Sequence, residues 1–371
     1  MKLEGLKVLD LSAFLPGPHM TMMMADHGAD VIMVEPDNRL GEPTRELGEK
    51  TVDGISVWFR NIARGKRSYK VNLKDPEQHV DFMRLAATAD VMVEAFRPGV
   101  VKRLGVDYDA IRAVNPAIVY CSISAFGQEG TYTQKPAHDL VVQTLAGLTD
   151  LSRAPDGTPA NPNMPSADMA ASLLALSGIL MALYRRQETG QGDYLDMAMY
   201  DSLLSWTPNI TGPVFAHDAH PEPANMRSFG GNAMNRIYAT SDGGHIVIGG
   251  SEIKFAHNLL TALGREDLVD IAKQQPGGQA ELIAFFTDIF ATKTQAEWES
   301  FLEDVECCWA GMRSLKAAFD DPHTIARGMV LCDDAGNRHI GNPIHFKHEP
   351  GHPNLDTPAF GEHTDILKTG E

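Results

Sequence analysis

The first two hundred residues alternate short apolar runs with helical stretches, and this alternation limits the possible folds more than any other feature of the chain. Apolar runs typical of buried strands occur at 7–11, 31–35, 68–72, 91–96, 118–123 and 193–199. Helical stretches between them are expected at 18–26, 75–89 and 108–114. Because near-continuous apolar strands belong to sheets buried on both faces, the pattern predicts an α/β fold with a parallel sheet between two helical layers.

The second half of the chain follows a different pattern. Two long helices are expected at 139–151 and 167–186, and residues 236–249 are typical of a hairpin that turns at Asp242. Helices should follow to about residue 319, and short β-like runs return at 328–331 and 343–346. We therefore expect a large domain over 1–216, a linker over 217–235, a small α+β domain over 236–319, and a return to the large domain over 320–371.

The charge of the chain restricts its partners. The 371 residues contain 32 Lys and Arg against 49 Asp and Glu, which gives a net charge of −17. Nucleic-acid-binding domains are usually basic, so neither nucleic acid nor an anionic membrane surface is expected as a partner. An anionic ligand must instead be held by a local group of cations that acts against the overall field.

Four further features point to a cytoplasmic, globular protein. The chain is 43% hydrophobic, which is enough for a large core. The longest apolar stretch, 169–184, is shorter than the ~20 residues that cross a bilayer and is expected to be a buried helix. The opening residues lack the apolar segment of a signal peptide, and the four cysteines form no CxxC pair, so neither a disulfide framework nor a metal site is predicted.

The turn after the first strand argues against a dinucleotide-binding enzyme. Such folds carry GxGxxG at this place, whereas Ser12–Pro18 contains a single glycine, Gly17, between two prolines. A dehydrogenase is therefore disfavoured. The turn either presents its backbone to a different ligand or is purely structural.

One dense basic cluster stands out in this acidic chain. It consists of Arg64, Lys66, Arg67, Lys70 and Lys74. Phosphate groups require such donors, although a run of charges is also typical of a solvated face. A looser basic pair, Arg97 and Arg103, follows the strand that ends at 96, which is where ligands bind in open α/β sheets.

Three acid–base residues occupy suggestive positions. Asp168 lies in the first turn of a predicted helix, where it is either a partner of the helix dipole or a nucleophile beside stabilising N–H groups. His138 begins the preceding helix thirty residues earlier, and Glu252 precedes a helix of the small domain. Either of the last two could be purely structural.

Taken together, these segments resemble class III CoA-transferases, the CaiB/BaiF superfamily, which includes formyl-CoA transferase, carnitine CoA-transferase and 2-methylacyl-CoA racemase. The resemblance covers essentially the whole chain. The matching segments, in order, are Val8–Ser12 with Gly17 and Pro18, Asp26–Glu35, Asn61–Lys74, Ala89–Gly99, Arg103–Gly105, Ala167–Ala171, Leu183–Gly192 and Gly361–Thr364.

The resemblance implies roles for individual residues. Asp168 matches the catalytic aspartate of the family. The positions that match contacts to CoA are Phe14, Leu15, Pro16, Val71, Lys74, Ala95, Phe96, Arg103 and Leu104. The family often has a basic residue directly after the glutamate at position 35, where this chain has Pro36, so Arg39 is the candidate substitute for that phosphate contact.

The resemblance also implies an architecture and a reaction. The implied fold is a large Rossmann-like domain whose sheet is built from both chain ends, with a small inserted domain, in an interlocked homodimer. The implied activity is transfer of CoA from an acyl-CoA to a carboxylic acid through a covalent aspartyl intermediate, with CoA as a substrate and no tightly bound cofactor. Gly230 and Gly231 are the candidates for a glycine-rich lid over the site.

Two other functions stay open from the sequence. A 2-methylacyl-CoA racemase would use His138 and Asp168 as an acid–base pair, with Glu252 in the matching place of the small domain. Against it, the segment after His138 continues with Gln143 and Gly147, which is closer to the transferases. A non-catalytic acyl-CoA-binding protein would bind CoA thioesters without needing Asp168.

Overall fold

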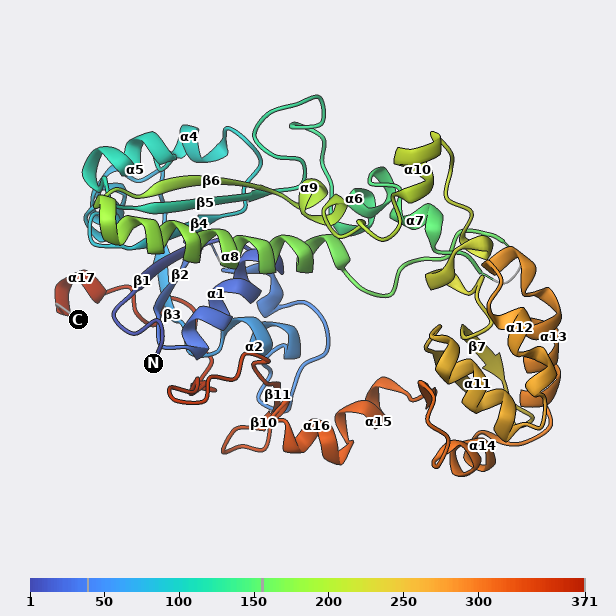
Figure 1. The fold of residues 1–371 in the computed structure, drawn as a ribbon. Helices are drawn as coiled ribbons and strands as arrows, with labels where there is room; N and C mark the ends of the chain where they lie inside the picture. The colour runs from blue at the N-terminus through green and yellow to red at the C-terminus, as the bar shows by residue number, and fades with distance from the viewer. Residues whose placement is uncertain (39, 155–156, 370–371) are drawn as a thin grey trace. The chain divides into compact units, whose positions relative to one another are not determined.

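The computed structural model describes residues 1–38, 40–154 and 157–369, which form two compact units (Figure 1). Unit 1 comprises Met1–Asp150, Ala160–Thr207 and Pro322–Glu371, and unit 2 comprises Leu151–Pro159 and Pro208–Asp321. The chain passes from unit 1 to unit 2 after residue 207 and returns at 322, where the sequence analysis expected 216 and 320.

Unit 1 is built on a six-stranded sheet in which every pairing is parallel, as predicted. The order across the sheet is β3-β2-β1-β4-β5-β6. The strands are β1 (Lys7–Leu11), β2 (Asp30–Pro36), β3 (Arg67–Val71), β4 (Val91–Glu94), β5 (Val119–Ser124) and β6 (Asp193–Ala198). The strand order reverses between β1 and β4, and ligands bind at such a reversal, outside the carboxyl ends of the strands.

Helices cover both faces of this sheet. Residues alternate along each strand, so Val8 and Val91 face one helical layer while Leu9 and Met92 face the other. The first layer contains α1 (Pro16–Asp26), α6 (Asp139–Leu145), α8 (Ser166–Thr189) and α9 (Met199–Leu204). The second contains α3 (Pro76–Ala86), α4 (Val100–Leu104) and α5 (Tyr108–Val114). A further helix, α2 (Val57–Ala63), packs Phe59 against Met33 of β2.

The longest helix, α8, has two different faces. By length and composition alone it could cross a membrane. One face, which includes Ala171, Ala175 and Ile179, is buried in the core of unit 1. On the remaining surface Met181 is 70% exposed and Tyr184 is 72% exposed. The helix therefore belongs to the core of unit 1 and presents further apolar side chains outward.

The helix expected over 139–151 is interrupted. The structure has α6 and then α7 (Leu148–Leu151), separated at Gly147. Gly147 has a φ of +81°, in the left-handed region that residues with a Cβ avoid, so the helix cannot continue through it.

Unit 2 carries a three-stranded antiparallel sheet and a small helical layer. The predicted hairpin is present as β7 (Asn235–Ala239) and β8 (His245–Gly249), and β9 (Trp309–Gly311) pairs with β8. The helices are α10 (Gly212–His217), α11 (Ile253–Ala262), α12 (Val269–Ala272), α13 (Ala280–Phe290), α14 (Gln295–Leu302) and α15 (Leu315–Phe319). Ala233 and Met234, which the sequence placed in a linker, are buried in the core of this unit.

The last fifty residues return to unit 1 but do not extend its sheet. They form α16 (Pro322–Ala326), a separate antiparallel pair of β10 (Val330–Cys332) and β11 (Arg338–Ile340), and α17 (Ile366–Thr369). Among the described residues this segment adds no strand to the six-stranded sheet. The expectation that both chain ends build the sheet is therefore wrong, and the β-like run at 343–346 forms no strand.

Hydrogen bonds nevertheless tie this segment to unit 1. The Arg64 guanidinium donates to the carbonyl oxygen of Ile340 at 2.6 Å. The N–H of Gly361 donates to Ser68 Oγ at 2.8 Å. Ile366 is buried in the same core as Leu9 and Met92. The C-terminal segment is thus a part of unit 1 that packs beside the sheet.

Candidate active site

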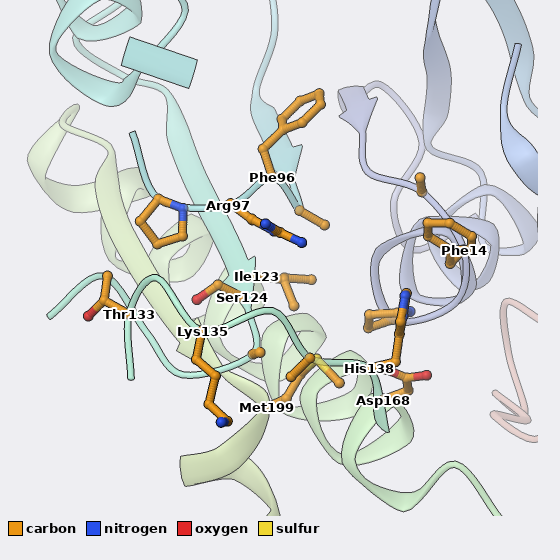
Figure 2. A pocket seen from close by; sticks show the side chains of 16 residues that line it. Phe14, Phe96, Arg97, Ile123, Ser124, Thr133, Lys135, His138, Asp168 and Met199 are labelled. Carbon is orange, nitrogen blue, oxygen red and sulfur yellow. The ribbon is translucent and has the colours of Figure 1, made fainter. Parts of the chain in front are cut away.

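Two hollows open at the carboxyl ends of the strands of unit 1, on either side of the strand reversal. Hollow 1 has a volume of about 320 Å³ and lies beyond β1, β4 and β5 (Figure 2). It is lined by Ala13, Phe14, Pro16, Ala95, Phe96, Arg97, Pro98, Ile123, Ser124, Ala125, Thr133, Lys135, Ala137, His138, Asp168 and Met199. Hollow 2, of about 450 Å³, lies beyond β1, β2 and β3. The two hollows share Ala13 and Phe96 as lining residues.

Asp168 lies in the first turn of α8 and lines hollow 1. Burial, and secondarily the nearby carboxylate of Asp139, raises the pKa of Asp168 to about 7. No residue in the described ranges donates a hydrogen bond to its carboxylate. An unbonded carboxylate with a raised pKa is more basic than an ordinary aspartate, and it is free to approach a substrate atom.

The backbone that carries Asp168 is held by Asp139 of α6. Oδ1 of Asp139 accepts hydrogen bonds from the N–H groups of Ala167 at 2.7 Å and of Asp168 at 3.1 Å. The residue at the N-cap position, Pro165, contributes no side-chain cap. Gln143 donates to the second oxygen of Asp139 and fixes its orientation. Asp139 therefore satisfies two N–H groups that the first turn of α8 would otherwise leave open.

Phe14 and His138 contribute the rings beside Asp168. Their centroids are 5.6 Å apart and their planes meet at 80°, an edge-to-face contact. Figure 2 shows Phe14, His138 and Asp168 on one side of the view, with Thr133 and Lys135 on the other. His138 is the residue directly before α6, and Asp139 is the first residue of that helix. These two adjacent residues therefore have different roles: His138 lines the hollow, and Asp139 accepts hydrogen bonds from the first turn of α8.

Phe96 forms the boundary between the two hollows, and a buried glutamate supports it. Oε2 of Glu94 accepts the N–H of Phe96 at 2.8 Å, while its other oxygen accepts from Ser122. Burial is the main cause that raises the pKa of Glu94 to about 7. Phe96 thus leaves β4 in a fixed direction, and Arg97 after it lines hollow 1.

The structure brings together most of the predicted site residues. Hollow 1 contains Asp168 and His138 together with Phe14, Pro16, Ala95 and Phe96. Hollow 2 contains Val71, Lys74 and Leu104, and again Phe96. The residues of the two hollows follow different strands of the sheet. Because the strands are parallel, their carboxyl ends lie at the same edge of the sheet, and the two sets of residues lie there too.

The other predicted residues lie elsewhere. Leu15 is half-buried at the start of α1, and Arg103 is exposed on α4; neither lines a hollow. Glu252 precedes α11 in unit 2, where it lines a shallow depression with Arg227 and Ser251. Arg39 lies outside the described residues.

The candidate lid glycines also belong to unit 2. Gly230 has a φ of +89°, and its carbonyl oxygen accepts a hydrogen bond from Arg236 of β7. A Cβ on Gly231 would lie 2.5 Å from the carbonyl oxygen of Ala224, so the backbone is closely packed at this point. The two glycines are held within their own unit.

The basic cluster that the sequence suggested for phosphate binding is mainly structural. Arg64 pairs with Asp26 at 2.7 Å and Lys66 with Asp10 at 3.0 Å, and all four side chains are buried. Arg67 pairs with Asp30, and Lys70 lies 3.5 Å from Asp37. Of this cluster, Lys74 alone lines a hollow among the described residues. The solvated-face alternative also fails for Arg64 and Lys66, because both are buried ion pairs.

Several site residues were missed by the sequence reasoning. Asp139, Ser124, Lys135 and Met199 reach hollow 1 or support Asp168. Ser124 ends β5, so the rule that ligands bind beyond strand ends would have indicated it. Lys135 lies in a loop with no local signal. Within the described ranges, no group of three or more His, Cys, Asp or Glu side chains is placed to hold a metal ion.

Comparison with known proteins gives consistent results. The model of CoA-transferase family III matches residues 3–364. Succinyl-CoA–D-citramalate CoA-transferase of Chloroflexus aurantiacus is 30% identical over 98% of this chain and 94% of its own length. Acetyl-CoA:oxalate CoA-transferase of Acetobacter aceti is 30% identical over 95% of this chain and 92% of its own length. A crystal structure of a CaiB/BaiF family protein from Brucella suis has 29% identity and a TM-score of 0.86, covering 99% of this chain and 98% of that one.

Proposed function

This chain belongs to CoA-transferase family III, and from that premise we propose that it moves CoA from an acyl-CoA donor to a carboxylic acid through a covalent intermediate on Asp168. CoA-transferases of this family use CoA thioesters as substrates. The observation that carries the proposal is the place of Asp168: an unbonded carboxylate at the edge of hollow 1, which adjoins hollow 2 at Phe96.

The proposed reaction has four substitutions at carbonyl carbon. The Asp168 carboxylate attacks the donor thioester, the C–S bond breaks, and a mixed anhydride and CoA thiolate form. The thiolate attacks the aspartyl carbonyl, which releases the donor acid and leaves an enzyme–CoA thioester. The acceptor carboxylate attacks that thioester to give a second anhydride and thiolate. The thiolate then attacks the acceptor carbonyl, which forms the new acyl-CoA and frees Asp168.

The geometry of the site supports this reaction in two ways. Hollow 1 contains Asp168, the proposed nucleophile, and the burial of its carboxylate limits the access of water that would hydrolyse an anhydride or thioester. Hollow 2 shares Phe96 with hollow 1 and also includes Lys74, and we infer that one long ligand occupies both. The reacting thioester is assigned to hollow 1 and the nucleotide end of CoA to hollow 2.

The substrates are proposed from the relatives. The two named above act on succinyl-CoA with D-citramalate and on acetyl-CoA with oxalate. Both acceptors are dicarboxylic acids, and the cations Arg97 and Lys135 line the same hollow as Asp168. We infer that a short dicarboxylic acid is the acceptor class to test first.

The racemase alternative has no support among these relatives. His138 and Asp168 do line the same hollow, as a racemase would require. The named relatives are CoA-transferases, however, and the transferase reaction gives His138 a different role, as one wall of the site.

We also propose that the protein is a homodimer. The support is the outer surface of α8, where several apolar side chains are more than a third exposed: Leu173, Leu180, Met181 and Tyr184. Several exposed apolar side chains on one helix are typical of a protein interface.

The experiment that tests the function captures the intermediate. The protein is incubated with succinyl-CoA and hydroxylamine, and the peptide that contains Asp168 is analysed by mass spectrometry. We expect an aspartyl hydroxamate at Asp168 and none in Asp168→Asn. Parallel incubation in deuterated water with a 2-methylacyl-CoA should leave the α-hydrogen in place. Rapid α-exchange without an adduct would overturn the transferase function and favour the racemase.

A further inference from the structure

We propose that Glu42 is a positioning residue that holds the strained backbone of Phe14 and thereby points the Phe14 ring into the active site. This inference rests on the proposed function, because it assigns Phe14 a role in a CoA-binding hollow. Glu42 precedes the short 3₁₀ helix η1 (Pro43–Arg45), between β2 and α2. It lines hollow 2 but not hollow 1, which holds the reacting atoms in the proposed function.

Phe14 has an unusual backbone. Its φ is +67°, and among the described non-glycine residues only Phe14 and Asp218 have a positive φ. This left-handed conformation is unfavourable for a residue with a bulky side chain, and it persists only where the surroundings enforce it. The residue is 36% exposed, so burial in the core does not compensate the strain.

Glu42 supplies the enforcing contact. Its Oε1 accepts the N–H of Phe14 at 2.8 Å, across 28 positions of sequence. Its Oε2 accepts the N–H of Thr44 at 2.7 Å and also the Thr44 hydroxyl. The side chain is buried and burial raises its pKa, so the carboxylate is kept in an environment that disfavours its charge.

The Glu42 backbone is anchored in its turn. Its N–H donates to Glu35 Oε2 at 2.8 Å, and the same carboxylate receives two hydrogen bonds from Arg45, at 2.8 and 2.7 Å. Arg45 also donates to the carbonyl oxygen of Pro358 at 3.0 Å. The Glu42 carboxylate, which accepts the Phe14 N–H, is therefore held in place by Glu35 of β2 and, through Arg45, by Pro358 of the C-terminal segment.

The rest of the β1–α1 turn is held at both sides of Phe14. Asp10 accepts the N–H of Ser12 at 3.0 Å, and Lys66 donates to the carbonyl oxygen of Pro18 at 2.9 Å. Between these two points, the Phe14 amide has Glu42 as its partner. Without that partner the residue is free to relax to a negative φ, and its ring would leave the edge-to-face contact with His138.

A double-mutant cycle tests this coupling. Phe14→Gly removes the ring and, because glycine accepts a positive φ, also removes the strain. Glu42→Ala, Phe14→Gly and the double variant are compared by kcat/KM for acyl-CoA transfer and by the Kd of CoA from calorimetry. We expect Glu42→Ala to lower kcat/KM about 30-fold in the wild-type background and less than about threefold in the Phe14→Gly background.

Further variants keep the test valid if Glu42→Ala fails to fold. Glu42→Gln keeps one oxygen but replaces the other with an NH2 group, so it cannot accept from both Phe14 and Thr44. Glu42→Asp shortens the side chain by one methylene. We expect each variant to lower kcat/KM by about three- to tenfold, and Phe14→Gly to remove most of that loss. Glu46→Ala, an exposed carboxylate four residues away, is the matched control and should leave all constants unchanged.

The outcomes separate the inference from the proposed function. If the losses in kcat/KM caused by Glu42→Ala and Phe14→Gly multiply in the double variant, the two residues act independently. Glu42 would then act elsewhere, for example by direct contact with ligand in hollow 2, and the positioning role would be overturned. A wild-type protein that binds CoA but transfers none would overturn the function, while the cycle measured on Kd would still decide the role of Glu42.

Discussion

Oδ1 of Asp139 accepts the backbone N–H of Asp168 at 3.1 Å, and the Asp139 carboxylate also contributes to the raised pKa of the Asp168 side chain. One residue therefore holds the backbone of Asp168, the proposed nucleophile, and increases the basicity of its carboxylate. The two effects have separate physical origins, because the hydrogen bond needs only an oxygen whereas the electrostatic effect needs a charge. Substitutions can distinguish them.

The first prediction concerns pH. Asp168 must be ionised to attack, and its pKa is about 7, so kcat/KM for acyl-CoA should rise through about pH 7 and then level off. Asp139→Asn keeps an oxygen acceptor but removes the charge, so it should move this rise to lower pH. The measurement is a pH–rate profile between pH 5 and 9, with the exposed Asp109→Asn as control. Identical midpoints in wild type and Asp139→Asn would contradict the assignment.

The second prediction concerns stability. The folded pKa of Asp168 is raised, so its contribution to stability is complete below the unfolded pKa of about 3.9 and is lost as pH rises through about 7. At pH 8 the wild type therefore retains a destabilising buried charge. Asp168→Asn should raise the free energy of unfolding by about 2 kcal/mol at pH 8 and by about half as much at pH 5.5. Urea denaturation at both pH values measures this, and a gain that does not depend on pH would refute it.

The third prediction concerns the CoA phosphates. Lys74 lines hollow 2, and Arg103 matches a family contact to CoA on the nearby helix α4. Because the chain has a net charge of −17, the binding of an anionic substrate should depend strongly on each cation near it. Lys74→Ala and Arg103→Ala should each raise KM for acyl-CoA about tenfold with little change in kcat, and Lys102→Ala is the matched control. A variant whose KM is unchanged does not contact CoA.

The fourth prediction concerns His138. In the proposed transferase it packs against Phe14 and forms part of the wall of hollow 1, and it carries no proton in the reaction. His138→Ala should therefore lower kcat about tenfold and still form the Asp168 adduct, while His138→Phe should retain more activity. Complete inactivity of both variants, with no adduct, would assign His138 a proton-transfer role.

The fifth prediction concerns assembly. If the outer surface of α8 is the dimer interface, the protein should sediment as a stable dimer at micromolar concentration. Met181→Asp places a charge on that surface and should shift the population toward monomer, whereas Lys254→Ala on unit 2 should not. An active wild-type monomer at this concentration would rule the dimer out.

The sequence predicted the parts of the fold that depend on local pattern. All six strands of the parallel sheet lie within two residues of their expected positions, because apolar runs and their bounding turns are local signals. Asp168 was located for the same reason, as a carboxylate in a helix's first turn. The hairpin that turns at Asp242 was likewise readable from its glycines.

The parts that could not be predicted depend on residues distant in the sequence. Asp139 reaches α8 across 29 positions and Glu42 reaches Phe14 across 28, and neither contact leaves a local pattern. The basic cluster was misjudged because charge alone does not reveal burial: Lys66 has its partner 56 positions earlier, in Asp10. The C-terminal β-like runs were too short to distinguish a strand from an extended segment.

The attachment of the last fifty residues to unit 1 has a consequence for biosynthesis. When residues 1–207 have left the ribosome, the Arg64 guanidinium still lacks the Ile340 carbonyl, and Ser68 Oγ lacks the Gly361 amide. The core around Leu9 and Met92 also lacks Ile366. Unit 2, by contrast, is complete once residue 321 has emerged. The unit whose synthesis begins first is thus the one whose packing is completed last, and these hydrogen-bonding groups stay paired with water until then.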